Sequence, residues 1–305
     1  MIQESVPQIT ASDIKILDLN PSEFYLWVDE VLEDEYILPV KTRISLRSED
    51  YFNVMPCVLP PLGYMGLKVV TRSEKRRANG DANIDGDILL YDYESCNLKA
   101  LMDSGLITTI RTASIAVHSM LHMAGEYSTI AMEGLGNIGT YIGIILFELI
   151  KDKPVKIKLY RYKNHAERFV EQFRHFDNLS FEICDTYESL MKDSDVVFSS
   201  VTYMEHDFCD SSIYKKGCTV IPVHMRGFKE CDKTFDHVIT SDLESIKKFQ
   251  NYDKMQKLSL INDVLKNKIA PRVYKDDRII IYNLGIALYD IYFASRLYER
   301  INLQK

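Results

Sequence analysis

Three glycines at a fixed spacing are the residues of this chain whose chemistry is easiest to define. Gly134, Gly136 and Gly139 fit the pattern G-x-G-x-x-G, after a short β-type stretch and before an apolar run of helix length. The first glycine permits a tight turn, the second lets backbone amides approach a pyrophosphate, and the third lets the helix pack against the strand. The helix N-terminus then faces the phosphates. The segment therefore predicts dinucleotide binding, and a tight strand–helix turn without a ligand is the alternative.

Two cations in apolar surroundings are candidates for binding a carboxylate. Lys68 lies in a β-like run of Met, Leu and Val, where a solvated ammonium is unusual. A lysine partly removed from water needs an anion or shifts its pKa downward, and either property suits a substrate site. Arg111 lies among apolar residues near the start of a helical pattern, where a guanidinium can hold a carboxylate at two points. The alternative for both is an aliphatic stem that covers core surface while the charge reaches solvent.

The second strand of the Rossmann pattern, which is the first strand after the glycines, indicates at its end which dinucleotide binds. NAD-preferring sites usually place Asp or Glu there, because a carboxylate accepts hydrogen bonds from the ribose 2′-hydroxyl. The segment 156–161 ends in Arg161 instead, with Lys163 nearby. A guanidinium suits a 2′-phosphate, so the sequence favours NADP(H) over NAD(H). An arginine that stacks on adenine without contacting the phosphate is the alternative.

The composition limits the class of protein that carries these residues. The chain has 305 residues, of which 46% are hydrophobic and 27% charged, and this is long enough for two globular domains. Its net charge of −7 makes extended binding to nucleic acid or to anionic membranes unexpected. Six scattered cysteines without a C-x-x-C pair favour reduced thiols in a cytoplasmic protein over disulfides or a zinc site.

Hydrophobic patterns predict the elements that must position these residues. Helices are expected at 20–38, from Thr108 onward, at 140–150 and up to Arg300 near the end. Strands are expected at 40–46, 51–55, 64–71, 88–93, 129–132, 155–160, 181–184, 195–201 and 218–223. The segment 72–86 has the composition of a polar loop. His118 and His122 are four residues apart, but no acid or cysteine lies nearby in sequence, so we expect no metal.

Four fragments carry a resemblance to a known family. They read Asn53-Val-Met-Pro56, Gly66-Leu-Lys-Val-Val-Thr71, Gly86-Asp-Ile-Leu-Leu-Tyr-Asp92 and Thr108-Thr-Ile-Arg-Thr-Ala113. Their order and spacing resemble the ornithine cyclodeaminase/mu-crystallin family, and the likeness extends over most of the chain. That family includes amino-acid cyclodeaminases, alanine dehydrogenases, cyclic ketimine reductases, opine-type enzymes and a hormone-binding crystallin. The resemblance implies a nicotinamide cofactor and a homodimer joined through sheet-forming N-terminal domains.

The resemblance also implies roles for individual residues. The family's functional lysine and arginine fall on Lys68 and Arg111, as contacts to the amine and the carboxylate of the substrate. Its additional substrate arginine is replaced by Lys41, and Arg43 follows on the same strand face, so either can serve. His224 occupies the place of the family's catalytic aspartate. We therefore expect Lys68 and His224 to be catalytic, with a rate that depends on a group titrating between about pH 6 and 8. The alternative for His224 is a histidine at a strand end that only hydrogen-bonds to backbone.

The region 281–290 resembles the family's closing Gly-x-Ala-x-x-Asp helix start, which borders the nicotinamide. This resemblance makes Leu284 and Gly285 cofactor contacts. Together with the glycine loop, the expected cofactor-binding residues are Thr112, Gly134, Gly136, Asn137, Ile138, Gly139, Arg161, Leu284 and Gly285.

These expectations combine into an α/β protein of two domains. Residues 1–115, joined by the helix 283–305, are expected to form an α+β domain for substrate binding and dimerisation. Residues 116–282 are expected to form a Rossmann-type domain, with the active site in the cleft between the two. The expected activity is NAD(P)H-dependent oxidation or reduction of the C–N bond of an amino acid or imino acid, by ketimine reduction, reductive amination or opine-type condensation. The alternatives are an ornithine or lysine cyclodeaminase that recycles bound NAD, and a non-catalytic NADP(H)-binding crystallin-like protein.

Overall fold

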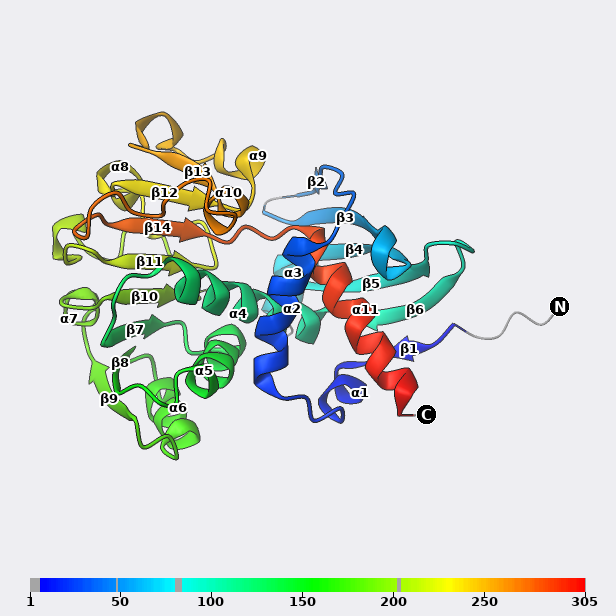
Figure 1. Cartoon of the computed structure of the whole chain (residues 1–305), viewed down its shortest axis with the longest axis horizontal. Helices are drawn as coiled ribbons and strands as arrows, with labels where there is room; N and C mark the ends of the chain where they lie inside the picture. Colours follow the sequence, from blue (N-terminus) through cyan, green and yellow to red (C-terminus); the bar gives the residue numbers. More distant parts are fainter. Residues whose placement is uncertain (1–5, 48, 80–83, 202–203, 305) are drawn as a thin grey trace. The chain divides into compact units, whose positions relative to one another are not determined.

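The computed structural model describes residues 6–47, 49–79, 84–201 and 204–304 (Figure 1). The chain divides into two compact units. Unit 1 contains residues 1–111 and 286–305, and unit 2 contains residues 112–285. One division falls inside helix α4 (Ser104–Met123) and the other directly before helix α11 (Ala287–Leu303). The domain limits expected from sequence were 115/116 and 282/283.

Unit 1 is built on a six-stranded sheet in the order β1-β6-β5-β4-β3-β2. Its strands are β1 (Gln8–Ile9), β2 (Thr42–Ser45), β3 (Tyr51–Leu59), β4 (Tyr64–Arg72), β5 (Ile84–Asp92) and β6 (Leu98–Asp103). Neighbouring strands are antiparallel except β1 and β6, which are parallel. Lys68 on β4 is paired with Met55 on β3 and Ile88 on β5, so it lies in the middle of the sheet.

Two segments of unit 1 differ from the sequence-based expectation. In the segment 72–86, expected as a polar loop, the described residues form helix α3 (Glu74–Ala78) and the start of β5, and residues 80–83 lie outside the described part of the chain. Strand β6 was not expected; its six residues, Leu98–Asp103, alternate only weakly in polarity, and β6 forms by pairing with β5. Pairing with a neighbouring strand, a tertiary property, decides the conformation of β6 and of the start of β5. At the start of α3, the backbone N–H of Glu74 donates to the side chain of Asp50, which is also distant in sequence.

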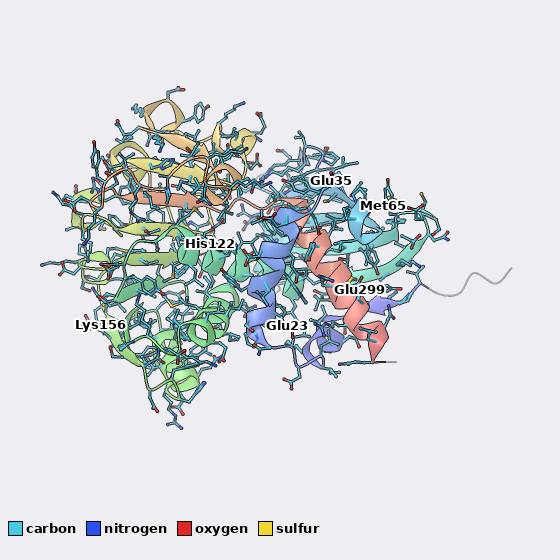
Figure 2. All side chains as sticks on the ribbon, viewed as in Figure 1. Glu23, Glu35, Met65, His122, Lys156 and Glu299 are labelled. Carbon is cyan, nitrogen blue, oxygen red and sulfur yellow. The ribbon has the colours of Figure 1, made fainter. Side chains whose placement is uncertain are left out.

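Helix α11 covers the sheet of unit 1. It packs on β3, β4 and β5 and also contacts α1 (Ala11–Lys15) and α2 (Pro21–Glu33), as Figure 1 shows. Asn20 caps α2 through its side chain, and Pro21 occupies the first turn, where a missing N–H costs nothing. Trp27 of α2 meets Phe293 of α11 edge to face, with ring centroids 5.2 Å apart. At the rim, Glu23 of α2, labelled in Figure 2, pairs with Arg300 of α11.

Unit 2 is a parallel sheet of eight strands in the order β13-β12-β14-β11-β10-β7-β8-β9. Its strands are β7 (Thr129–Glu133), β8 (Val155–Tyr160), β9 (Leu179–Cys184), β10 (Val196–Ser199), β11 (Thr219–Pro222), β12 (His237–Thr240), β13 (Leu258–Leu260) and β14 (Ile279–Tyr282). The order reverses between β7 and β10, since β8 and β9 lie on one side and β10 and β11 on the other. This is the Rossmann arrangement, in which ligands bind at the carboxyl ends of the strands beside the reversal.

Helices connect the strands of unit 2. They are α5 (Asn137–Leu149), α6 (His165–Phe173), α7 (Tyr187–Met191), α8 (Cys231–Thr234), α9 (Leu243–Ile246) and α10 (Ile261–Leu265). The apolar α5 is packed closely against α6: a Cβ on Gly143 would lie 2.8 Å from the ring of Phe169 and 2.9 Å from that of Phe173. Among the residues that the structure describes, no helix has both the length and the apolar character that crossing a membrane requires.

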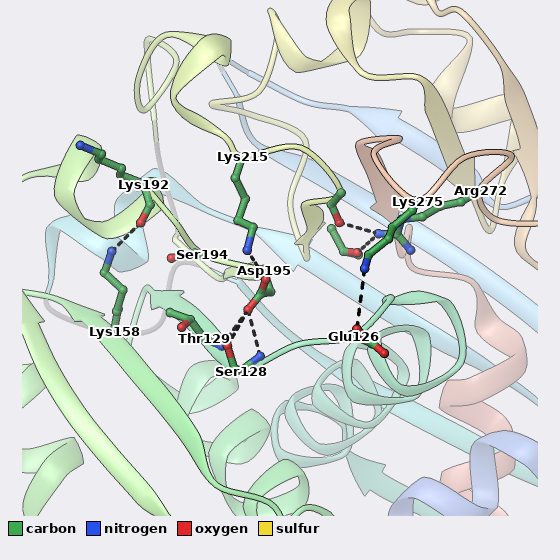
Figure 3. Close-up of polar contacts among 12 residues, drawn as sticks. Glu126, Ser128, Thr129, Lys158, Lys192, Ser194, Asp195, Lys215, Arg272 and Lys275 are labelled. Carbon is green, nitrogen blue, oxygen red and sulfur yellow. Dashed lines mark hydrogen bonds and ion pairs between the residues drawn. The ribbon is translucent and has the colours of Figure 1, made fainter.

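The amino ends of the central strands of unit 2 are held by Asp195 (Figure 3). Its carboxylate accepts hydrogen bonds from the backbone amides of Ser128 and Thr129, each at 2.9 Å, and pairs with Lys215. Arg272 extends this network by donating to the backbone oxygens of Met123 and Gly217. Because these contacts lie at the amino ends, they fix the strands in register without occupying the carboxyl ends, where a Rossmann fold binds its ligand.

Candidate functional site

Three charged side chains meet inside unit 1. Nζ of Lys68 lies 2.9 Å from Oδ1 of Asp290, and Nε of Arg111 lies 2.8 Å from the same oxygen. Nζ of Lys68 also donates to Oγ1 of Thr108 at 2.5 Å. The exposed fractions are 2% for Lys68, 6% for Arg111 and 0% for Asp290. With all three groups ionised, this Lys68–Asp290–Arg111 cluster carries a net charge of +1, so a further anionic group such as a carboxylate would neutralise it.

Three elements bring the cluster together. Lys68 lies on the central strand β4, Arg111 on α4, and Asp290 in the first turn of α11, where a helix N-terminus favours an acid. Gly66 lets α11 approach the sheet, since a Cβ there would lie 3.1 Å from the side chain of Ile291. Asp290 was not among the predicted site residues. The signal that could have found it is an acid at the start of an otherwise apolar helix.

Burial and charge together set the protonation of the cluster. Burial lowers the pKa of Lys68 to about 8, with Asp290 opposing the shift and Arg111 adding to it. For Asp290, burial alone would raise the pKa, but Arg111 and Lys68 hold it below its usual value. Oδ2 of Asp290 is buried and has no hydrogen-bond partner among the described residues. Lys68 can therefore exchange a proton near neutral pH, whereas Asp290 stays ionised and keeps one oxygen as an acceptor.

Lys41 and Arg43 lie at the edge of the sheet of unit 1. Arg43 belongs to β2, two strands away from the strand that carries Lys68. Its side chain is exposed, and its guanidinium lies 4.0 Å from the centroid of the Tyr51 ring. Lys41 precedes the strand and is half-buried. A role for either residue in holding the substrate stays a prediction.

The glycine loop of unit 2 has the geometry of a pyrophosphate-binding turn. Gly134 has a φ of +76°, and a Cβ there would lie 2.4 Å from the backbone of Ser200. A Cβ on Gly139 would lie 2.5 Å from the carbonyl oxygen of Gly134. Gly136 caps α5, and a Cβ on it would meet no described atom within 4 Å. Two glycines are therefore required by packing, and the third leaves the N-terminus of α5 accessible, so these residues fit a bound dinucleotide.

The remaining predicted cofactor residues lie at the start of α5, on α4 and after strand β14. Asn137 and Ile138 form the first turn of α5, and Asn137 is exposed. Thr112 is buried on α4. Leu284 follows β14, and its carbonyl oxygen accepts a 2.8 Å hydrogen bond from Ser241 Oγ; Gly285 comes next. Their contacts with a cofactor stay predictions.

Arg161 directly follows β8 and is held by two acids. Its Nε donates to Oδ1 of Asp185 at 2.6 Å, and the guanidinium also pairs with Glu167. The side chain is 45% exposed, so water screens both pairs. A ribose 2′-phosphate would have to compete with these carboxylates, which reduces the preference for NADP(H) that a free arginine would produce.

His224 lies just beyond β11 and uses both ring nitrogens. Nε2 is 2.5 Å from Oγ of Ser199, and Nδ1 accepts a 3.3 Å hydrogen bond from the backbone N–H of Arg226. Because Nδ1 accepts, the proton of the neutral ring is on Nε2, and the Nε2–H group donates a hydrogen bond to Oγ of Ser199. Burial lowers the pKa of His224 to about 4. The imidazole is therefore neutral near pH 7, and its surroundings do not support the expected titration of His224 between pH 6 and 8.

The fold and these sites define the class of protein: a Rossmann-type dinucleotide-binding unit combined with an α+β unit that holds a buried cationic cluster. Residues 31–305 match the ornithine cyclodeaminase/mu-crystallin family, and the chain belongs to that family.

Individual relatives are distant but cover nearly the whole chain. The protein is 26% identical to the nodulation efficiency protein NfeD of Rhizobium meliloti, over 86% of this chain and 83% of that protein. It is 21% identical to the delta(1)-pyrroline-2-carboxylate reductase of Bacillus cereus, over 94% and 93%. Its fold is similar to that of the delta(1)-pyrroline-2-carboxylate reductase of Thermococcus litoralis, solved with NADH and L-proline, with a TM-score of 0.85, 16% identity and 98% coverage of both chains. These similarities confirm the predicted fold class and family.

Proposed function

We propose that this protein is an NAD(P)H-dependent oxidoreductase that acts on the C–N bond of an amino acid or imino acid. The observation that carries the proposal is the buried Lys68–Asp290–Arg111 cluster, whose net positive charge suits a carboxylate and whose lysine has a pKa of about 8. The glycine loop of unit 2 supports it, because the loop fits a dinucleotide. The name of the Bacillus cereus relative, a reductase of a cyclic imino acid, points to the same class of substrate.

Arg111 holds the substrate carboxylate in this proposal. Its contact with Asp290 is made through Nε and restrains the guanidinium plane. The edge formed by Nη1 and Nη2 is the donor pair that matches the two oxygens of a carboxylate. An imino acid bound in this way has its C=N carbon beside the held carboxylate, so its orientation is fixed before reaction.

Lys68 exchanges the proton of the reacting nitrogen. The nicotinamide cofactor supplies or accepts the hydride. During reduction, protonated Lys68 donates a proton to the nitrogen of the imine, and Thr108 and Asp290 keep Nζ in place. Since the donor must be protonated, reduction is expected to slow as the pH rises through about 8, the pKa of Lys68.

His224 acts in this proposal as a neutral hydrogen-bonding residue. The family resemblance places His224 at the position where related cyclodeaminases have an aspartate. The carboxylate of such an aspartate would engage a cationic amine of the substrate. A neutral imidazole lacks that charge. We therefore propose a substrate without the free terminal amine of ornithine.

The experiment that tests the function is turnover by the purified protein with NADPH and NADH. A panel of cyclic ketimine carboxylates, and of keto acids with amines, is offered while the absorbance of the reduced nicotinamide is followed. Oxidation of the cofactor with at least one carboxylated imine is the expected result. Cofactor binding without turnover of any substrate would indicate a crystallin-like binding protein instead. Ammonia release from ornithine with formation of proline would indicate a cyclodeaminase.

The cofactor preference provides a test of Arg161. We propose that NADPH binds about three- to tenfold more tightly than NADH, because a guanidinium favours a 2′-phosphate while Asp185 and Glu167 compete for it. Fluorescence titration of Arg161→Ala should give similar affinities for both cofactors. Arg168→Ala, at an exposed position of α6, is the matched control and should keep the wild-type ratio. Equal affinities in the wild-type protein would contradict the preference.

The edge of the sheet in unit 1 suggests a homodimer. Strand β2 is an edge strand that is exposed along its length, and exposed apolar side chains gather around it in sequence. They are Ile37, Val40, Ile44 and Leu46. Open edges and apolar patches of this kind pair with a partner, so we propose a dimer through this edge.

Sedimentation at micromolar protein should therefore give twice the chain mass of 35.3 kDa. Ile44→Glu should shift the protein toward the monomer, because a charge replaces an apolar contact. Leu303→Glu, at the exposed end of α11, should leave the dimer intact. A wild-type protein that sediments only as a monomer would refute the proposal.

A further inference from the structure

The carboxyl ends of two neighbouring strands in unit 2 carry buried polar side chains, and a partly buried histidine follows the end of the next strand. In the register of the sheet, Glu133 of β7 pairs with Ser199 of β10, and Ser199 pairs with Pro222 of β11. His224 follows two residues later and bonds to the Ser199 hydroxyl. Paired residues of parallel strands point to the same face, so the side chains of Glu133 and Ser199 lie next to each other. We name this set the Glu133–Ser199–His224 row.

Glu133 lies where an anion is poorly stabilised. It is 1% exposed, and neither carboxyl oxygen has a hydrogen bond of normal geometry to a described group. Burial raises the pKa of Glu133 to about 8, and the nearby Ser199 hydroxyl opposes this only in part. A buried carboxyl without a cationic partner is protonated rather than ionised at neutral pH. Glu133 is therefore a neutral acid in the free protein at pH 7.

The titratable groups around Glu133 do not change charge near neutral pH. Those that interact with it are Tyr187 of α7 together with Cys209 and Tyr214. Burial raises the pKa of Cys209 to about 11 and raises the pKa of both tyrosines well above the usual value. His224 at the other end of the row has a pKa of about 4 and is also uncharged. Within this set, Glu133 is the group that gains a charge between about pH 7 and 9.

The row is attached directly to the glycine loop. Glu133 immediately precedes Gly134, and the next residue after Ser199, Ser200, holds the loop from the neighbouring strand. Oγ of Ser200 donates to the carbonyl oxygen of Gly134 at 2.6 Å, and its backbone N–H donates to that of Glu133 at 3.1 Å. A negative charge on Glu133 would thus arise beside the turn that is shaped for a pyrophosphate, in surroundings that screen charge weakly.

We propose that Glu133 is a positioning residue of the cofactor site that must be uncharged for a dinucleotide to bind tightly. As a neutral acid it completes the Glu133–Ser199–His224 row beside the loop, and as an anion it opposes the pyrophosphate. This inference rests on the proposed function only in requiring that a dinucleotide binds at the loop. By linkage, binding above the pKa of Glu133 takes up one proton, so log Kd rises with pH with a slope of up to one.

The test is a fluorescence titration of the full chain with NADPH between about pH 6 and 9.5. For the wild-type protein, Kd should rise about tenfold over the upper half of this range. Glu133→Gln keeps the shape and cannot ionise, so its Kd should stay nearly constant. Asp232→Asn is the matched control: Asp232 is a buried acid of the same unit whose pKa burial raises to about 7, and it accepts a hydrogen bond from Tyr282. This variant should keep the wild-type pH dependence.

Three results separate the possible failures. A wild-type Kd that does not change with pH, or a Glu133→Gln protein with the wild-type slope, would overturn the inference. If no variant binds NADPH or NADH at any pH, the proposed function fails instead. If Kd no longer changes with pH in Asp232→Asn, Asp232 rather than Glu133 causes the pH dependence, and the inference is also overturned.

A stability measurement without cofactor provides an independent check. Glu133 has a folded pKa of about 8, above the ordinary value of 4.5, so it costs stability progressively as the pH rises from 4.5 to 8. Glu133→Gln should therefore raise Tm more at about pH 9 than at about pH 4.5. A change in Tm that is the same at both pH values would contradict the assignment of Glu133 as a neutral buried acid.

Discussion

Lys68→Met is expected to lower turnover by about 10²–10⁴-fold while binding of the reduced cofactor stays nearly unchanged. Methionine keeps the length of the stem between β3 and β5 but removes the ammonium that exchanges the proton of the substrate nitrogen. The Arg111–Asp290 contact remains, so the buried carboxylate of Asp290 keeps one cationic partner. Steady-state kinetics, together with fluorescence titration of NADPH, measure the two effects separately.

The matched control for Lys68 is Lys99→Met. Lys99 lies on β6 of the same sheet and pairs with Asp92 near the surface, and its removal should leave turnover at the wild-type level. In the wild-type protein, the rate of reduction should decline as the pH rises through about 8, because burial lowers the pKa of Lys68 to that value. Lys68→Met with wild-type kinetics would show that the cluster is not the source of the proton.

Arg111→Lys is expected to raise KM by about ten- to a hundredfold and to lower kcat as well. An ammonium at this position can still neutralise part of the charge on Asp290, so the fold should tolerate the change. It cannot bond to Asp290 through one nitrogen and offer a planar pair of donors to a carboxylate. The variant therefore loses orientation of the substrate as well as affinity.

A substrate analogue distinguishes this loss from general damage to unit 1. The wild-type protein should discriminate strongly between an imino acid and its carboxamide, whereas Arg111→Lys should discriminate weakly. Arg76→Lys, at a half-buried arginine that donates to the backbone oxygen of Thr71, should keep the discrimination. If Arg111→Lys still prefers the carboxylate as strongly as the wild-type protein, another residue holds that group. Lys41 and Arg43 would then be the next candidates.

The parts of the protein that were predicted correctly are those that short stretches of sequence specify. The turn at 134–139 needs glycine because of a positive φ at Gly134 and close packing at Gly139, and both requirements act within a few residues. Of the strands of unit 2, β7, β8, β9, β10 and β11 were expected, and β7, β10 and β11 are mainly apolar, as a parallel sheet covered on both faces demands. Strands β12, β13 and β14 were not expected. The apolar surroundings of Lys68 and Arg111 indicated that both cations are buried, and they are, but their roles toward a substrate stay predictions.

The parts that were missed depend on residues far apart in the chain. Asp290 is 222 residues from Lys68 and 179 from Arg111, and no local pattern indicates that the three share one oxygen. Strand β6 has weak alternation and is formed by its pairing with β5. Glu133 gave no signal as part of a β-type segment, because its burial depends on the strand and loops that pack beside it.

The sequence by itself determined the types of residue available for chemistry: glycines for a pyrophosphate, a lysine and an arginine in apolar strands and helices, and a histidine in place of an acid. The tertiary structure decided their charge. His224 was expected to titrate near neutral pH, but burial makes it a neutral group with a pKa of about 4. Lys68 and Glu133, whose ordinary pKa values lie far apart, are both moved to about 8. The physical reason is that a pKa depends on removal from water and on the charges nearby, and both are fixed only when distant segments pack together.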